Sequence, residues 1–182
     1  SLAALSGAGD KALVLGGGAI GLGAALSLRA QGVGNITVVE PNPARRAYLI
    51  NHCGQTVTDH PTNETLFDLV IDGVGYATTR ATASACVRPG GVIGHIGLGE
   101  DTGGLDIRRM TLQEITFIGT YTYTAEDFLQ TAQAIFDGRL GRLDWAEIRP
   151  LSTGAEAFSD IRRGVVAAPK ILLRPEITPE RI

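Results

Sequence analysis

Short apolar runs alternate along the chain with longer segments in which apolar residues repeat at helical spacing. The runs are rich in Val, Ile and Leu without regular polar alternation, which is typical of parallel strands covered on both faces. They predict strands at residues 11–15, 35–40, 56–58, 67–72, 91–96 and 115–119. The longer segments predict helices at residues 20–31, 43–53, 77–87 and 125–136.

Alternating strands and helices require right-handed crossovers. The predicted fold is therefore α/β, a doubly wound parallel sheet of the Rossmann type in three α/β/α layers. Asn42 before Pro43, and Thr124 before the last of these helices, are suitable N-caps. The link from Thr58 to Phe67 is short and contains Pro61, so we expect a loop there instead of a helix.

After Gly138 the pattern changes to an extended piece at 145–151, a short helix at 153–162 and a last strand at 170–173. We therefore divide the chain into a lead-in (1–10), a dinucleotide-binding Rossmann domain (11–144), a C-terminal segment (145–174) and a tail (175–182).

Composition excludes several classes of protein. The chain has 182 residues, of which 44% are hydrophobic and 19% charged, values expected of a globular protein. Residues 12–28 carry no charge, but their glycines favour a strand, a turn and a helix over a membrane span. The net charge is −3 and no stretch concentrates basic residues, so neither nucleic acid nor membrane is expected as a partner.

The cysteines and histidines predict no metal site. Cys53 and Cys86 form neither a disulfide framework nor a metal-ligand spacing, and His52, His60 and His95 are not spaced as ligands. The first residues lack the layout of a signal peptide, so a reduced, cytoplasmic setting is expected.

The most informative motif is Gly16-x-Gly18-x-x-Gly21, between a predicted strand and a predicted helix. In a dinucleotide-binding turn the first glycine permits the bend, the second lets the backbone approach a pyrophosphate, and the third lets the helix lie close to the strand. The helix N-terminus then offers free N–H groups to the phosphates. In so glycine-rich a chain, a simple packing turn is the alternative.

Glu40 ends the second predicted strand, close to the roughly 20 residues after the turn at which a carboxylate binds the adenosine ribose. Its charge would repel the 2′-phosphate of NADP, so NAD is the predicted cofactor. Arg45 and Arg46 complicate this choice, because a nearby arginine can accommodate that phosphate.

Two other functions remain open from the residues. An S-adenosylmethionine-dependent methyltransferase also has a glycine loop and an acid after its second strand, although Gly21 and the apolar Leu15 favour a dinucleotide. A stand-alone NAD-binding or NAD-sensing module is the other alternative.

The chain resembles the medium-chain dehydrogenase/reductase family, in particular its zinc-dependent alcohol and polyol dehydrogenases. The similar segments are residues 14–21, 38–41, 67–75, 89–98 and 114–119, with a closing segment at 150–175. The resemblance implies an oxidoreductase in which hydride passes between an alcohol or carbonyl and NAD(H).

The resemblance also implies roles for individual residues. The turn would hold the pyrophosphate, Glu40 the ribose, Arg45 would lie beside the adenosine, and other residues would line the cofactor site. The predicted cofactor-binding residues are Gly16, Gly18, Ala19, Ile20, Gly21, Glu40, Pro41, Arg45, Val74, Ile96, Gly97, Leu98, Thr120 and Tyr121.

Enzymes of this family begin with a catalytic domain that holds the zinc ligands, and this sequence contains no such segment. The resemblance therefore implies that zinc belongs to an absent part, that no catalytic residue lies here, and that the chain alone is inactive. Residues 145–174 would belong to that catalytic domain. Relatives also pair through the sixth strand, so a homodimer through residues 115–121 is expected.

Overall fold

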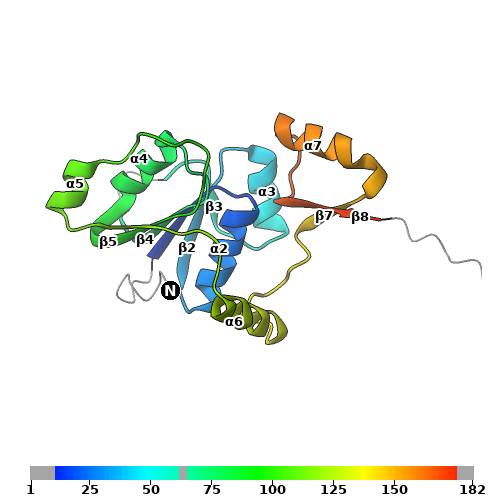
Figure 1. The fold of residues 1–182 in the computed structure, drawn as a ribbon, viewed down its shortest axis with the longest axis horizontal. Helices are drawn as coiled ribbons and strands as arrows, with labels where there is room; N and C mark the ends of the chain where they lie inside the picture. The colour runs from blue at the N-terminus through cyan, green and yellow to red at the C-terminus, as the bar shows by residue number, and fades with distance from the viewer. Residues whose placement is uncertain (1–10, 62–64, 176–182) are drawn as a thin grey trace, which may run out of the picture.

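The computed structural model describes residues 11–61 and 65–175. Its main sheet has six parallel strands in the order β3-β2-β1-β4-β5-β6 (Figure 1). Their bounds are Lys11–Leu15 (β1), Asn35–Val39 (β2), Val57–Thr58 (β3), Phe67–Asp72 (β4), Val87–His95 (β5) and Thr116–Gly119 (β6). The order is that of a Rossmann fold. The predicted fold class is confirmed.

Helices cover both faces of this sheet. One face carries α2 (Ala19–Ala30) and α3 (Pro43–Asn51), and the other carries α4 (Ala77–Cys86) and α5 (Ile107–Leu112). Successive strand residues point to opposite faces. Ala12 and Val14 of β1 accordingly belong to the apolar cluster beneath α2, whereas Leu13 and Leu15 belong to the cluster beneath α4. Burial on both faces explains why β1 contains apolar residues without alternation.

Local capping begins two of the helices as predicted. The Asn42 side chain accepts hydrogen bonds from the backbone N–H groups of Ala44 and Arg45 at 3.0 and 3.1 Å. Thr124 and Asp127 form a reciprocal capping box at the start of α6 (Ala125–Phe136). The described residues of the link between β3 and β4 form no helix, as Pro61 predicted.

Most bounds agree with the sequence prediction to within two residues, and the largest differences concern β5 and α5. β5 begins at Val87 instead of residue 91, because the buried Val87 pairs with Phe67 before the register shifts between Phe67 and Leu69. The short helix α5 was not predicted. Asp106 caps it by accepting from the Arg109 N–H at 2.8 Å, but six residues are too few for helical periodicity to be recognised.

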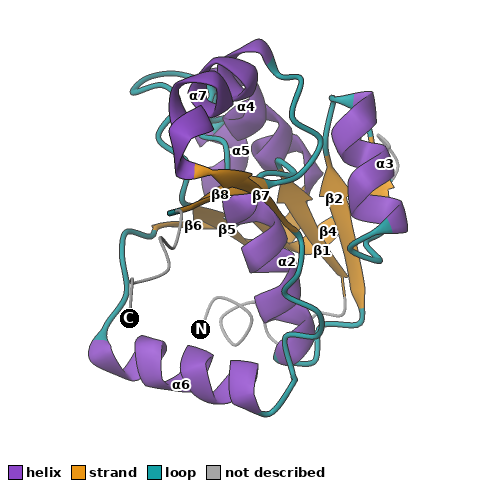
Figure 2. Ribbon diagram, turned by 90° about the vertical axis from the view of Figure 1, so that its right-hand side faces the viewer, coloured by secondary structure: helices purple, strands orange, loops and turns teal. Residues whose placement is uncertain are grey.

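The C-terminal part forms a second, parallel two-stranded sheet of β7 (Ala146–Pro150) and β8 (Lys170–Arg174). A 3₁₀ turn (Leu151–Thr153) and α7 (Gly154–Arg163) connect the two strands. This unit lies beside α3 (Figure 1), whereas α6 lies near the C-terminal end of α2 (Figure 2). The Asn42 Nδ2 donates to the carbonyl of Gly164 at 2.7 Å, and the Tyr48 hydroxyl donates to that of Trp145 at 3.3 Å.

Residues 12–28 form β1, the glycine turn and most of α2, as expected from their glycines. Over the described ranges, none of the helices is long and apolar enough to cross a membrane. The predicted lead-in, and residues 176–182 of the predicted tail, lie outside the described residues.

Two glycines of α2 provide a matched test of the close contact between helix and strand. A Cβ on Gly21 would overlap the carbonyl oxygen of Gly16, whereas a Cβ on Gly23 would meet nothing within 4 Å. Gly21→Ala is expected to lower the free energy of unfolding by about 3 kcal/mol, because the clash is with backbone. Gly23→Ala should instead raise it by roughly 0.5–1 kcal/mol, because alanine favours the helix. Urea unfolding measures both, and equal stability of the two variants would contradict the assignment.

Candidate functional site

The carboxyl ends of the parallel strands meet at one edge of the sheet. Leu15 is in register with Val39 on one side and with Asp72 on the other, and Asp72 is in register with His95. The chain leaves β1 toward β2 and later returns to the opposite side of β1 as β4, so the strand order reverses between β1 and β4. Ligands of open α/β sheets bind outside the strand ends at such a point.

The glycine turn after β1 has three distinct requirements. Gly16 has φ +95°, and a Cβ there would lie 2.5 Å from the Cγ2 of Val74. Gly21 has no room for a side chain against Gly16. Gly18 differs, because a Cβ there would meet no atom of the described protein within 4 Å. Packing among the described residues therefore explains why positions 16 and 21 are glycine. It does not explain why position 18 is glycine, because the space above Gly18 is open.

The N-terminus of α2 lies at this open space. Its N-cap, Gly18, offers no side-chain acceptor, and the first turn contains no acidic residue. The first N–H groups of a helix have no partner within the helix. They constitute a partial positive charge suited to an anion such as a phosphate.

Glu40 joins the end of β2 to the glycine turn. Its side chain is buried, with the residue only 5% exposed, and its Oε2 accepts a hydrogen bond from the N–H of Gly17 at 3.0 Å. Its Oε1 accepts from the N–H of Asn42 at 2.8 Å. A carboxylate has about four acceptor positions, so two remain for a ligand.

Both arginines after β2 are engaged by the protein itself. Arg45 Nη1 lies 3.8 Å from Glu40 Oε2, and its Nη2 donates to the carbonyl of Val166 at 3.0 Å. Arg46 Nη1 donates to the carbonyls of Glu40 and Pro41 at 2.9 and 2.6 Å. The buried Nε of Arg45 has no hydrogen-bond partner among the described residues, and Nη1 makes only the 3.8 Å ion pair with Glu40.

A cleft of about 420 Å³ opens over the glycine turn, the end of β2 and the turn after β4. It brings together most of the predicted cofactor-binding residues. These are Gly16, Gly18, Ala19, Ile20, Gly21, Glu40, Pro41, Arg45 and Val74.

The other predicted residues lie at the same edge of the sheet but outside this cleft. The side chain of Ile96 packs against the apolar cluster beneath α2, and Gly97 contacts the backbone of Val74. Leu98 and Tyr121 are 80% and 81% exposed. Thr120 continues β6, and its N–H donates to the carbonyl of His95 at 2.8 Å.

Gly17 and Gly73 also line the cleft and were not among the predicted residues. The motif leaves the position of Gly17 free, yet a Cβ there would lie 2.5 Å from Leu49 Cδ1 and 3.0 Å from Glu40. Only the fold brings Leu49 to this point, so the motif alone could not reveal the requirement. Gly73 directly follows the apolar run of β4, and this position at a strand end could have predicted that it lines the cleft.

The described residues do not fit a metal site. They contain no group of three or more His, Cys, Asp or Glu side chains that could hold an ion. Cys53 and Cys86 are both free, and burial raises the pKa of each thiol, which disfavours the thiolate that zinc requires.

Comparison with protein families identifies the chain. The family model for the zinc-binding dehydrogenase matches residues 19–137, which is more than half of the sequence. The chain belongs to the zinc-binding dehydrogenase family. This membership agrees with the resemblance inferred from the motifs, and it does not favour a methyltransferase or a stand-alone sensor.

Two curated relatives of this zinc-binding dehydrogenase chain illustrate its extent. The probable diacetyl reductase [(R)-acetoin forming] 2 of Saccharomyces cerevisiae is 30% identical over 175 residues, covering 87% of this chain and 41% of that protein. The geraniol dehydrogenase of Castellaniella defragrans is 32% identical over 103 residues, covering 50% of this chain and 28% of that protein. The chain thus spans less than half the length of these relatives.

Solved structures support the fold. Acetophenone reductase from Geotrichum candidum, in complex with NAD, has a TM-score of 0.74 at 20% identity, covering 87% of this chain and 46% of that one. The yhdH oxidoreductase from Salmonella enterica, in complex with NADP, has a TM-score of 0.70 at 17% identity, covering 91% of this chain and 55% of that one. Both cofactors therefore occur among proteins of this fold.

Glu40 is expected to stabilise the protein even without a ligand. Glu40→Ala leaves the N–H groups of Gly17 and Asn42 without their acceptor, and a buried unpaired donor costs roughly 1–3 kcal/mol. We expect the free energy of unfolding of the ligand-free chain to fall by about 2 kcal/mol in a urea titration. Glu126→Ala is the control, because this exposed glutamate bonds to Gln130 on the same helix. A Glu40→Ala variant as stable as the wild type would contradict the bridging role.

Proposed function

We propose that this chain is the dinucleotide-binding part of an NAD(H)-dependent alcohol or polyol dehydrogenase. The observation that carries the proposal is the joint opening of the glycine turn and Glu40 onto one cleft at the reversal of strand order. Among the described residues, no atom lies within 4 Å of the position that a Cβ on Gly18 would take, and a ligand that approaches the backbone explains the absence of a side chain there.

In this proposal the free N–H groups at the start of α2 bind the pyrophosphate. The remaining acceptor positions of Glu40 receive the adenosine ribose hydroxyls, and Pro41 and Arg45 border the adenosine. Val74 lies at the middle of the dinucleotide. Ile96, Gly97, Leu98, Thr120 and Tyr121 follow β5 and β6 at the same edge, and we assign them to the nicotinamide end.

Several contacts favour NAD over NADP. A 2′-phosphate would meet the negative charge of the buried Glu40. Arg46 is engaged by two backbone carbonyls, and Arg45 by Glu40 and the carbonyl of Val166. To turn toward an additional phosphate, either guanidinium would have to give up these contacts.

When bound, the nicotinamide supplies hydride transfer at C4. The contribution of this chain is to bind and orient the dinucleotide. The names of the relatives concern alcohols and carbonyl compounds, from which we infer that class of substrate. We assign activation of the substrate, and any zinc, to a catalytic domain that these 182 residues do not include. We place the enzyme in the cytoplasm, with its two cysteines free.

We also propose that residues 11–144 form the dinucleotide-binding domain and that 145–174 belong to the catalytic part. Both parts carry exposed apolar side chains, on α6 in the first and on α7 in the second. Large exposed apolar surfaces commonly mark contacts with another part of a protein, so both helices are candidates for such a contact. The exposed side chains include Phe128, Leu129, Phe136, Phe158 and Ile161.

Titration with NADH, NADPH and S-adenosylmethionine, followed by fluorescence and calorimetry, tests the proposed function. NADH is expected to bind most tightly, because Glu40 disfavours the 2′-phosphate. Gly18→Ala should weaken NADH binding about tenfold or more while leaving the unfolding transition unchanged, because its Cβ would occupy only the open space. Gly23→Ala, in the same helix and also without close neighbours, should bind NADH like the wild type. Tightest binding of S-adenosylmethionine, or unchanged NADH binding by Gly18→Ala, would overturn the proposal.

The exposed edge of β6 supports a further proposal, a homodimer. In the described sheet β6 pairs with β5 on one side and is the terminal strand on the other. A free strand edge can pair with a second copy, and an edge lysine opposes such pairing. Sedimentation should therefore show a dimer that Thr116→Lys converts to monomer. Thr111→Lys, an equal charge change on α5, should remain dimeric; a monomeric wild type would contradict the proposal.

A further inference from the structure

The guanidinium of Arg80, on α4, is buried beside the proposed site. The residue is 6% exposed, and all of its acceptors are backbone carbonyls. Nη1 donates to Gly75 and Glu100 at 2.9 and 3.0 Å, Nε donates to Gly103 at 2.6 Å, and Nη2 donates to Thr102. None of these acceptors is a carboxylate. The side chain therefore connects chain segments and does not serve to neutralise an acid.

These carbonyls come from two loops that are far apart in sequence. Gly75 belongs to the turn after β4, and the other three residues belong to the loop after β5. Backbone bonds join the same loops, from Gly99 N–H to Val74 at 3.1 Å and from Glu100 N–H to Gly75 at 2.8 Å. We call residues 73–76 and 96–104 together the β4–β5 lip.

The lip is a contact of backbone with backbone. Gly75 has φ +79°, and a Cβ on it would overlap the carbonyl of Gly97, while a Cβ on Gly97 would overlap the backbone of Val74. No side chain fits between the loops at this contact. Their relative position consequently depends on hydrogen bonds, which are directional and are stronger when the donor is charged.

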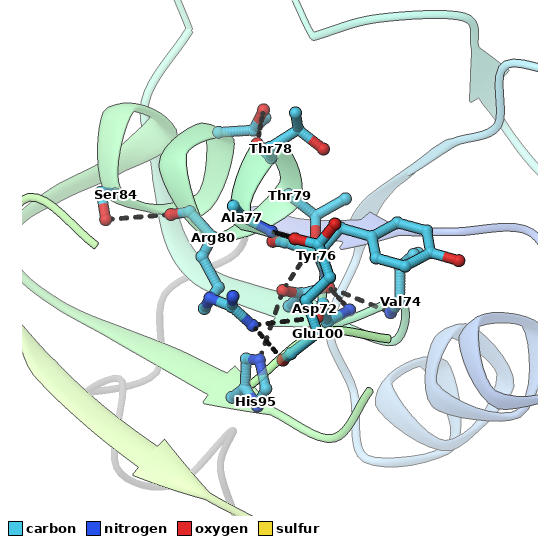
Figure 3. A network of polar contacts seen from close by, with 12 residues as sticks. Asp72, Val74, Tyr76, Ala77, Thr78, Thr79, Arg80, Ser84, His95 and Glu100 are labelled. Atoms are coloured by element: carbon cyan, nitrogen blue, oxygen red, sulfur yellow. Dashed lines mark hydrogen bonds and ion pairs between the residues drawn. The ribbon is translucent and has the colours of Figure 1, made fainter. Parts of the chain in front are cut away.

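Asp72 and Glu100 belong to the same network, which is shown in Figure 3. The buried Asp72 accepts from the N–H groups of Val74 and Gly75 at 3.0 and 2.9 Å, and from the hydroxyl of Thr79 at 3.0 Å. Glu100 Oε2 accepts from the N–H of Ala77, at the start of α4, at 2.7 Å. Asp72 thus fixes the turn after β4, and Arg80 holds the loop after β5 against it.

The two loops of the lip border different parts of the proposed dinucleotide site. Gly73 and Val74 line the cleft next to the glycine turn, and Gly97 lies against Val74 on the side of β5, whereas Glu40 lies on the opposite side of β1, at the end of β2. Asp72 holds the turn after β4, so loss of the Arg80 bonds would displace mainly the loop after β5. The nicotinamide end would change, and the adenosine end would stay in place.

We propose that Arg80 is a positioning residue for the nicotinamide end of the dinucleotide, acting through the β4–β5 lip. The inference rests on the proposed function, because it requires a dinucleotide in the cleft. It goes beyond that function by assigning the selective placement of nicotinamide to a side chain that would not touch the ligand.

Comparison of NADH with ADP-ribose, which lacks the nicotinamide, tests this role in the 182-residue chain. Arg80→Met keeps much of the apolar stem and removes all the donors. We expect it to weaken NADH binding about tenfold and to change ADP-ribose binding by less than about twofold. The shift in NADH emission that accompanies enclosure of the nicotinamide ring should be lost as well. The NADH affinity of Arg80→Lys should lie between those of the wild type and Arg80→Met, because one ammonium group cannot reach all four carbonyls.

Arg109→Met is the matched control. Arg109 also donates to backbone carbonyls of the α4 region, those of Ser84 and Val87, but away from the lip. Its loss should lower stability without changing the ratio of NADH to ADP-ribose affinity. Circular dichroism and thermal melts establish whether each variant folds. If Arg80→Met does not fold, Arg80→Lys is used to compare the two ligands.

Three outcomes would overturn the inference. These are equal weakening of both ligands by the Arg80 variants, the same selective loss in Arg109→Met, or a wild type that binds NADH no more tightly than ADP-ribose. The last outcome would leave the proposed function standing, since the adenosine half would still bind. A wild type that binds neither ligand would overturn the proposed function and this inference with it.

Discussion

The carboxylate of Glu40 accepts the N–H of Gly17 with one oxygen and that of Asn42 with the other. These two hydrogen bonds connect the turn before α2 with the turn before α3, at the ends of the neighbouring strands β1 and β2. A buried carboxylate is costly unless it is hydrogen-bonded, so the charge and the two turns stabilise one another. The direction in which the first N–H groups of α2 point, and hence the proposed phosphate site, follows from this arrangement.

The same construction recurs after β4 and β5. Glycines let the backbones of Val74 and Gly97 approach without intervening side chains, and the buried polar groups of Asp72 and Arg80 hold them there. The middle of the sheet is held by apolar burial on both faces, whereas its ligand edge is held by directional bonds to backbone. Hydrogen bonds define positions more sharply than apolar contact does, because they depend on angle as well as distance.

The family of the chain and the share of its relatives' length that it covers together limit which functions it can contribute. The chain belongs to the zinc-binding dehydrogenases, yet it spans less than half the length of the relatives compared. The cleft is lined by the glycine turn and by the carboxylate of Glu40, and no metal-ligand cluster occurs in the described ranges. The proposal therefore assigns cofactor binding to this chain and substrate activation to other residues.

The sequence by itself determined the strands and the longer helices to within a few residues, because apolar periodicity and caps such as Asn42 act over a single turn or strand. It did not reveal the six-residue helix α5. It also determined the core of the candidate cleft, since Gly16, Gly18, Gly21 and Glu40 belong to one strand–helix–strand unit whose geometry fixes their spacing. Only the tertiary structure decided that Arg45 reaches Val166, that Gly17 must avoid Leu49, and that Arg80 joins two loops. These pairs are distant in the chain, and their contacts arise from how whole elements pack, which no local pattern of residues records.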